Sequence, residues 1–406
     1  MKKAGSSQNH SIHRPRRDMR GLPPGIWALG LVSMFMDISS ELIHSLLPVF
    51  MAAVLGASMT TIGIIEGVGE AAAACAKVFS GAVSDFFRKR KLLVGLGYGL
   101  AALTKPLFPL ADSIHWVFAG RFIDRIGKGI RGAPRDALVA DLAPPERRGA
   151  AFGLRQSLDS TGAFVGPLLA LAFMAWLAND IRLVLWVAVV PAFIAVLVLI
   201  FAVHEPRRSE PNDSSPKRLT LRDARRLPAP YWLIVLLGGV FTLARFSEAF
   251  LVLRASDVGL DLGWVPLVLI VMNVVYTASA FPAGLAADRL RSRRMLLAGL
   301  IQLIAADLLL AVAASPITAF AGIACWGLHL GFTQGLFAKL VADVAPVELR
   351  GTAFGIFNLV NGGALLMASV IAGGLWGAFG APVTFLVGAS FAALAAGGLS
   401  VFGRMA

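Results

Sequence analysis

The stretch RFIDRIGKGIRGAPRD, residues 121–136, concentrates charged side chains within otherwise apolar sequence. On a helix that turns ~100° per residue, these side chains fall within an arc of roughly 140°. They are Arg121, Asp124, Arg125, Lys128, Arg131, Arg135 and Asp136. From the first to the last arginine the helix covers ~21 Å, much of a ~30 Å hydrocarbon core. Cations at such depth need carboxylates or an anionic ligand as partners.

The composition indicates a membrane protein. The 406 residues are 57% hydrophobic and 15% charged, and the mean hydropathy is +0.74. These values exclude an ordinary soluble protein. Apolar runs of sufficient length predict about twelve spans. The predicted spans are residues 25–53, 60–84, 92–111, 115–138, 151–177, 183–203, 231–254, 263–286, 294–313, 317–340, 351–377 and 381–402.

The net charge of +13 is distributed unevenly among the loops. Lys and Arg collect before the first span, in alternate loops and in the long middle loop. By the positive-inside rule, both termini and this middle loop are cytoplasmic, in a multi-pass protein of the cytoplasmic (inner) membrane. The basic tail is therefore interpreted as a topology signal that contacts anionic membrane lipids, and no nucleic-acid partner is expected. Cys75 and Cys325 lie within predicted spans and indicate neither a disulfide framework nor a metal site, and no cofactor is expected.

An internal repeat divides the chain into two homologous halves. VADLAPPERRGAAFGLRQ at 139–156 recurs as VADVAPVELRGTAFGIFN at 341–358, and the segment 81–95 recurs at 284–299. Both copies fall on the same side of the membrane, so the halves are predicted to be parallel repeats. The predicted parts are a basic cytoplasmic tail (1–24), an N-terminal six-helix bundle (25–203), a Pro-rich cytoplasmic linker (204–230) and a C-terminal six-helix bundle (231–406).

The repeated loop after the second span carries a family signature, G-x-x-x-D-[RK]-x-G-[RK]-[RK]. It occurs as GAVSDFFRKR and again as GLAADRLRSR. In these features the chain resembles the major facilitator superfamily over nearly its whole length. The resemblance implies an all-α polytopic fold of twelve transmembrane helices in two bundles, and secondary transport by alternating access. It also implies a conformational latch formed by Gly81, Asp85, Lys89, Arg90, Gly284, Asp288, Arg289 and Arg293.

Two further signatures of this family are partly matched. The fourth-helix pattern R-x-x-x-G-x-G occurs as RFIDRIG, in which Arg125 replaces the first glycine. The fifth-helix pattern of exporters occurs as GAFVGPLLAL, in which Gly162, Gly166 and Pro167 match and the final glycine pair is missing. The resemblance therefore favours efflux, as in an antiporter of a bacterial branch with unassigned substrate. Uptake of an anionic nutrient or metal chelate remains the alternative.

Acidic residues in the first two spans are candidates for proton coupling. They are Asp37, Glu41, Glu66 and Glu70, together with His44. Counted from the ends of their spans, Glu66 and Glu70 lie at depths similar to Arg121 and Arg125, so these residues are predicted to face each other. A carboxylate beside an arginine at mid-membrane is a candidate proton-exchange site.

The same charges have a purely structural interpretation. The predicted spans of the first half hold seven acids and eight bases, and such near-balance is what internal neutralisation in a low dielectric requires. The second half lacks equivalent charges, since Asn273 aligns with Glu70 and Asn361 with Asp159. The candidates for substrate binding or the charge network are therefore Arg121, Asp124, Arg125, Lys128, Asp159, Asn273 and Asn361.

These observations predict a monomeric transporter of a small molecule, with protons as coupling ion and no enzymatic activity. A remote alternative is a non-transporting membrane sensor or enzyme, in which Ser40, Glu41 and His44 would supply the reactive groups. The sequence contains neither HExxH nor GxSxG, so no catalytic residues are assigned.

Overall fold

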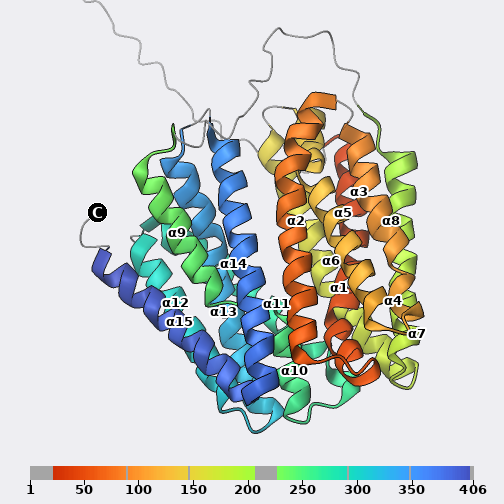
Figure 1. The fold of residues 1–406 in the computed structure, drawn as a ribbon. Coiled ribbons are helices and arrows are strands. Elements are labelled where there is room, and N and C mark those ends of the chain that lie inside the picture. The colour runs from red at the N-terminus through yellow and green to blue at the C-terminus, as the bar shows by residue number, and fades with distance from the viewer. Residues whose placement is uncertain are drawn as a thin grey trace, which may run out of the picture.

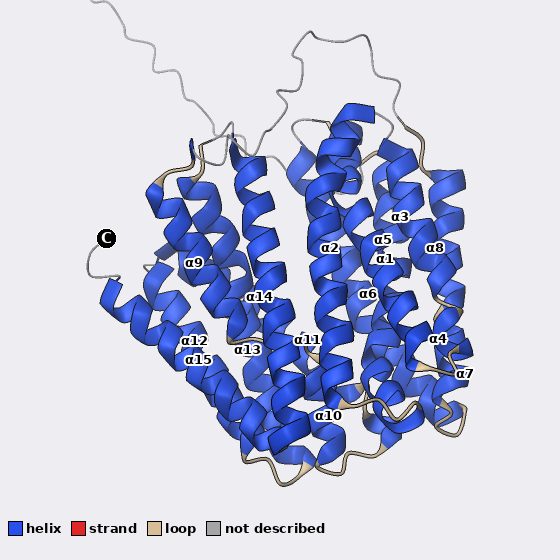
Figure 2. Cartoon of the chain, in the orientation of Figure 1, coloured by secondary structure: helices blue, strands red, loops and turns tan. Residues whose placement is uncertain are grey.

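The computed structural model of the chain describes residues 22–87, 90–144, 147–205, 226–289, 292–346 and 349–402. Within these ranges all regular secondary structure is helical, as Figure 2 shows. This result confirms the expected all-α architecture. The helices form two groups that lie side by side (Figure 1).

The first half contains the elements from α1 to α8. They are α1 (Pro24–Val49), η2 (Phe50–Val54), α2 (Met59–Phe87), α3 (Arg90–Thr104), α4 (Leu107–Leu110), α5 (Ile114–Leu142), α6 (Arg148–Trp176), α7 (Ile181–Val187) and α8 (Val189–Ala202). The second half contains α9 (Ala229–Leu243), α10 (Ala249–Asp257), η5 (Leu262–Trp264), α11 (Leu267–Arg289), α12 (Ser292–Ala311), α13 (Pro316–Val344), α14 (Arg350–Phe379) and α15 (Ala381–Phe402).

Local sequence sets several helix ends. Pro24 occupies the first position of α1, where its missing N–H costs no hydrogen bond. The Asp180 side chain accepts hydrogen bonds from the first N–H groups of α7, and Ser315 forms a capping box with Thr318 at the start of α13. At the end of α14 the chain turns through Gly380, whose φ of 85° suits glycine.

Nine helices in the described part of the chain are long and apolar enough to cross a membrane. Neither α2 nor α5 is among them, because charged residues lower their apolar content. The apolar helix α9 has only 15 residues. Each predicted span falls on one helix or on two consecutive helices. The exact count of twelve spans nevertheless stays a prediction.

Several predicted spans fall on two helical elements, and two of these interruptions contain charged residues. The chain turns at Lys105 and Pro106 between α3 and α4, where a proline inside the span favours a kink. The span predicted at 231–254 is not continuous, because residues 244–248 separate α9 from α10. This break places non-helical backbone at mid-span, which a membrane protein tolerates only where protein or a water-filled cavity surrounds it.

The two ends of the molecule differ in how the halves meet. We call the end at which α8 ends and α9 begins the linker side, at the top of Figure 1, and the opposite end the far side. The largest apolar cluster joins residues of both halves at the far side, including Leu46 and Phe50 with Phe250 and Trp376. Two smaller clusters near the linker side each belong to one half. Apolar packing therefore seals the far side more completely than the linker side.

Glycines bring α2 of the first half against α14 of the second half. A Cβ on Gly373 would lie 2.5 Å from the carbonyl oxygen of Met59, and a Cβ on Gly63 would clash with the carbonyl oxygen of Ser369. Such close backbone approach is typical of membrane helices that pack through small residues. The far-side contact between the halves therefore depends on these glycines.

Substitution Gly373→Val is expected to destabilise the protein, because the added side chain cannot enter the contact with α2. The cost of such overpacking is about 1–3 kcal/mol. A Cβ on the neighbouring Gly374 would meet no atom within 4 Å, so Gly374→Val provides a matched control. Thermal unfolding of the purified variants measures the difference, and an equal loss of stability in both variants would contradict the packing role.

Candidate functional site

The charged face of α5 is turned into the protein. Arg121, Asp124, Arg125 and Arg131 are each 2–4% exposed. Helix α5 packs against α2 and α3, and a Cβ on Gly129 would lie 2.5 Å from the carbonyl oxygen of Ala73. This close approach places the arginines of α5 beside the acids of α2.

Buried ion pairs neutralise the deepest charges of α5. Arg121 donates to Glu66 at 2.6 Å, and Arg125 lies 3.1 Å from Glu70. The predicted approach of these residues is confirmed. From the turn between α3 and α4, the Lys105 ammonium contacts Asp124 on the same face at 2.9 Å. Each short pair offsets the desolvation of its members, which is the arrangement the structural interpretation requires.

The two acids of α2 differ in their access to solvent. The Glu66 side chain is 1% exposed, and its Oε2 accepts a long hydrogen bond of 3.5 Å from Ser247 of the second half. The Glu70 side chain, one turn further along, is 33% exposed. Glu66 is thus enclosed where the halves meet, whereas Glu70 reaches open space.

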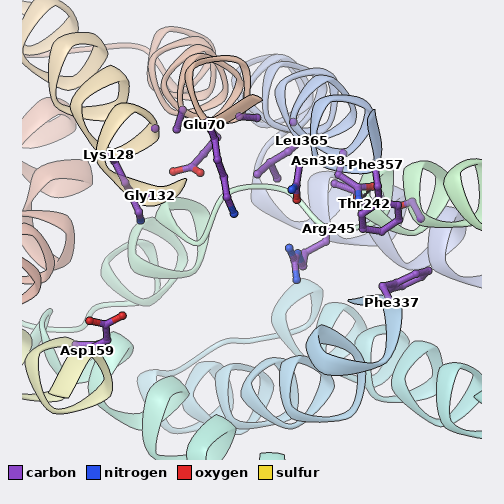
Figure 3. Close-up of a pocket in the computed structure, with 18 of the residues that line it drawn as sticks. Glu70, Lys128, Gly132, Asp159, Thr242, Arg245, Phe337, Phe357, Asn358 and Leu365 are labelled. Atoms are coloured by element: carbon purple, nitrogen blue, oxygen red, sulfur yellow. Dashed lines mark hydrogen bonds between the residues drawn. The ribbon is translucent and has the colours of Figure 1, made fainter. Parts of the chain in front are cut away.

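That space is a cavity of about 720 Å³ between the halves. It is lined by residues of α1, α2, α5 and α6 from the first half, and of α9, α11, α13, α14 and the 244–248 break from the second. All lining residues lie in the middle or linker-side portions of their helices. Figure 3 shows Glu70, Lys128, Asp159 and Arg245 around it. The charged lining residues are Asp37, Glu41, Glu70, Lys77, Lys128, Arg131, Arg135, Asp159 and Arg245.

A second group of ion pairs lies on the linker-side half of α5 and α6. The Arg155 guanidinium donates to Asp159 at 2.6 Å. Arg135 lies 3.8 Å from the same carboxylate, donates to Ser33 at 2.9 Å and contacts the half-exposed Asp136 at 3.3 Å. This group ties α5 to α6 and α1 on one wall of the cavity.

The predicted proton-coupling residues of α1 divide between cavity and interior. Asp37 and Glu41 line the cavity, whereas His44 does not. The His44 Nδ1 lies 3.4 Å from the Glu41 carboxylate. Ser40 accepts a hydrogen bond from Lys105 at 3.0 Å. The serine and the histidine therefore have separate partners, and they do not form a nucleophile–base pair.

The two asparagines predicted from the repeat have different positions. Asn361 lines the cavity and accepts a hydrogen bond from Thr242 at 3.1 Å. Asn273 is not among the lining residues, but Tyr276, almost one turn later on α11, is. The structure thus brings Glu70, Asp159 and Asn361 to one cavity and leaves Asn273 outside it.

Several cavity residues lie outside the predicted set. The clearest is Arg245, which sits in the break between α9 and α10 and lines the cavity. Its segment contains no proline or glycine, so the sequence gives little sign that the helix stops there. Lys77 and Arg131 are evident from the sequence as charged members of their helices, and only the structure shows that both reach the cavity.

The proposed latch lies largely beyond what the structure describes. Gly81 and Asp85 are in α2, and Gly284, Asp288 and Arg289 in α11, but their side chains are not described, and Lys89 is outside the described residues. Two members have defined contacts. Arg90 is ion-paired with Asp141 and donates to the carbonyl of Ala137 at 2.8 Å, so it joins α3 to α5. Arg293 donates to the carbonyl of Ser400 at 2.6 Å, joining α12 to α15.

Comparisons with known proteins agree with this architecture. The sequence profile of the Major Facilitator Superfamily matches residues 29–272 and 249–404. An uncharacterised MFS-type transporter of Methanocaldococcus jannaschii, MJ1317, is 31% identical over 391 residues, which cover 94% of this chain and 96% of that protein. The multidrug resistance protein MdtH of Proteus mirabilis is 29% identical over 178 residues, covering 44% of this chain and 42% of that protein. The solved structure of the nucleoside transporter NupG has a TM-score of 0.78 at 14% identity and covers 93% of this chain and 99% of that one, which shows a shared fold.

Removal of the Arg121 charge by Arg121→Gln is expected to lower the free energy of unfolding by about 3–5 kcal/mol, because Glu66 is left buried without its partner. The double variant Glu66→Gln, Arg121→Gln is expected to recover much of that loss. Denaturant or thermal unfolding of both variants measures the coupling. Additive losses in the double variant would show that the pair is not a mutually dependent unit.

Proposed function

Because the chain belongs to the Major Facilitator Superfamily and is a membrane transporter, we propose that it moves a small solute by proton-coupled alternating access, with Glu70 as the proton carrier. The membrane is the cytoplasmic membrane in this proposal, and the linker side faces the cytoplasm. The excess of Lys and Arg in the tail and middle loop supports that orientation. The protein acts as a monomer, since each chain has its own cavity between two halves.

Alternating access is supported by the way the halves meet. Apolar residues of both halves pack at the far side, while the cavity lies toward the linker side. Rocking of one half against the other about the central cavity would exchange the sealed end with the open one. This conformation is therefore the state that loads from, or releases to, the linker side.

The observation that carries the proton-coupling proposal is the position of Glu70 between a buried network and open space. Its carboxylate contacts Arg125 at 3.1 Å, and its side chain is one-third exposed to the cavity. A proton can therefore reach it from the cavity. When Glu70 is neutralised, the Asp124 carboxylate remains 4.0 Å from Arg125 and can compensate the positive charge of that arginine.

Other charged groups surround Glu70 on every side. Those that face it are Arg121, Arg125 and Lys128 of α5, His44 of α1, and Arg245 and Glu248 of the break between α9 and α10. Cations outnumber carboxylates in this set, so the free energy of placing a proton on Glu70 changes when the solute or the conformational change alters these contacts. Coupling follows from that dependence, because solute and proton each change the other's free energy of binding.

Export is the direction favoured by the sequence of α6. Gly162 and Gly166 of its GxxxGP pattern pack against the backbone of α1, where a Cβ would lie 2.5 Å and 2.7 Å from carbonyl oxygens of Met34 and Ile38. The partial similarity to a multidrug resistance protein also supports export. As an exporter coupled to protons the protein would be an antiporter.

Uptake of an anionic nutrient or metal chelate is the second candidate. It is favoured by a different observation, the number of cationic side chains in the cavity. A catalytic pair of Ser40 and His44 is not supported, since the two side chains are bound to different partners.

Substitution Glu70→Gln is expected to abolish proton movement coupled to solute, because the amide cannot carry the proton. Proteoliposomes loaded with the pH dye pyranine are challenged with small organic acids and lipophilic dyes, and the internal pH is followed. Asp112→Asn, an exposed carboxylate on the far side, serves as the control and should respond like the parent. A solute-induced pH change that persists in Glu70→Gln would refute this carrier.

A further inference from the structure

We propose that the solute is a small organic anion with an apolar body, bound in the cavity between cationic side chains of both halves and carried together with protons. The inference rests on the proton-coupled alternating access proposed above, takes uptake, the second candidate given there, as the direction, and names the substrate class of that site. The binding cations are Lys77, Lys128 and Arg131 of the first half and Arg245 of the second half. Arg121 and Arg125 are not among them, because each is buried against a carboxylate and lies outside the cavity lining.

The charges that line the cavity do not balance once their short contacts are assigned. Those contacts are Glu70 with Arg125, Glu41 with His44, and Asp159 with Arg155 and Arg135. Among the described residues, Lys77, Lys128, Arg131 and Arg245 have no ion pair within 4.0 Å. Asp37 has no such ion pair either, and Glu41 contacts only His44, whose imidazole is cationic only when protonated. Four cations thus face two carboxylates, and a bound anion would supply the missing negative charge.

The surroundings of Arg131 are the strongest indication that the cavity binds an anion and does not hold only water. The residue is 4% exposed, and its guanidinium lies 4.6 Å from the centroid of the Tyr98 ring. Its Nη1 is buried and has no hydrogen-bond partner among the residues described. The ring face stabilises the cation from one side, but an unpaired guanidinium N–H in a low dielectric remains costly. An anion bound in the cavity beside the Arg131 guanidinium would offset this cost electrostatically.

Arg245 supplies a cation from the opposite half. It is part-buried in the non-helical segment 244–248 and projects into the cavity in Figure 3. Because Lys128 lies across the cavity on α5, an anion that contacts both residues links the two halves electrostatically. Such a bridge gives the anion a different binding energy in each conformation, which transport by alternating access requires.

The second half also offers an aromatic wall for an apolar body. Phe241 and Phe337 have ring centroids 5.1 Å apart, and Phe337 and Phe357 have centroids 5.8 Å apart. All three rings line the cavity. Apolar walls with a few convergent charged groups are typical of sites for small organic molecules. This wall favours an organic anion over a bare inorganic one.

The sign of the cavity charge also bears on coupling. Neutralising Glu70 makes the cavity more positive, so a proton on Glu70 strengthens anion binding and the anion strengthens proton binding. Mutual reinforcement favours movement of both in the same direction. An inside-negative membrane potential opposes entry of an anion by ~2.3 kcal/mol per charge at 100 mV, and accompanying protons offset that opposition. The charge inventory therefore favours the uptake candidate over antiport.

The test is a charge series at constant shape, applied to the purified full-length protein. The probes are 1-naphthoate, 1-naphthyl phosphate, 1-naphthamide and 1-naphthylmethylamine, and thermal stabilisation and calorimetric affinity are measured. The two anions are expected to bind, and affinity should fall as salt rises. A preference between them distinguishes carboxylate from phosphate recognition. Equal or tighter binding of the amide or the amine, or no binding by either anion, would overturn the inference.

Variants assign the binding to particular cations. Arg245→Gln and Arg131→Gln are each expected to weaken anion binding by about tenfold, the loss of one charge-assisted contact. Arg245→Lys keeps the positive charge and should retain part of the affinity. A full loss of affinity in this variant would attribute the effect of Arg245→Gln to a change in local structure. Arg294→Gln, an exposed arginine of α12 outside the cavity, is the matched control. Unchanged affinity in Arg245→Gln would refute the site.

Glu70→Gln separates this inference from the proposed function. The variant should bind 1-naphthoate at least as tightly as the parent, with affinity that no longer rises as pH falls. Anion binding by the parent protein without any flux of the bound anion in liposomes would refute the transport proposal and leave the anion site standing. Glu70-dependent flux of a cationic or neutral solute, with no anion binding, would refute the anion site alone.

Discussion

Charge in a membrane helix must be compensated within the protein, and this constraint organises the first half. Helix α5 carries seven charged residues on one face, and that face cannot meet lipid. Glycines let α5 approach α2 closely enough for direct ion pairs, and the turn after α3 brings Lys105 to Asp124. The packing of these helices is therefore dictated as much by pairing of charges as by apolar contact. Lys77, Lys128 and Arg131, which have no ion pair within 4.0 Å among the described residues, line the cavity.

Glu66 and Glu70 form similar ion pairs with arginines of α5 but differ in their surroundings. Glu66 and Glu70 each face an arginine of α5 one turn apart, at 2.6 Å and 3.1 Å. Glu66 is enclosed and also reaches Ser247 of the other half, so a change in its charge would disturb the contact between halves. Glu70 borders the cavity, where solute and solvent can reach it. Position along the helix, rather than chemical type, separates a structural ion pair from a candidate carrier.

The sequence predicts the helices and the deepest pairs well, because both follow from regular spacing. Hydropathy locates the spans, and helical depth correctly brings Glu66 to Arg121 and Glu70 to Arg125. The break at 244–248 is not predictable in this way, since its residues include neither proline nor glycine. The repeat likewise aligns Asn273 with Glu70, but Tyr276 lines the cavity from α11 and Asn273 does not. Helical periodicity defines a charged face and leaves open which neighbour each side chain meets.

Internal pairing is proposed to leave a cavity with excess positive charge, and this excess can be measured without knowing the solute. In a variant whose Cys75 and Cys325 are replaced by serine, Ser160→Cys places one thiol on the cavity wall. Its rates of modification by anionic and cationic methanethiosulfonate reagents are compared with those of Ala314→Cys, an exposed position outside the cavity. We expect a ratio that favours the anionic reagent at position 160 and declines in Arg131→Gln. Equal ratios at the two positions, or a preference for the cationic reagent in the cavity, would contradict an excess of positive charge there.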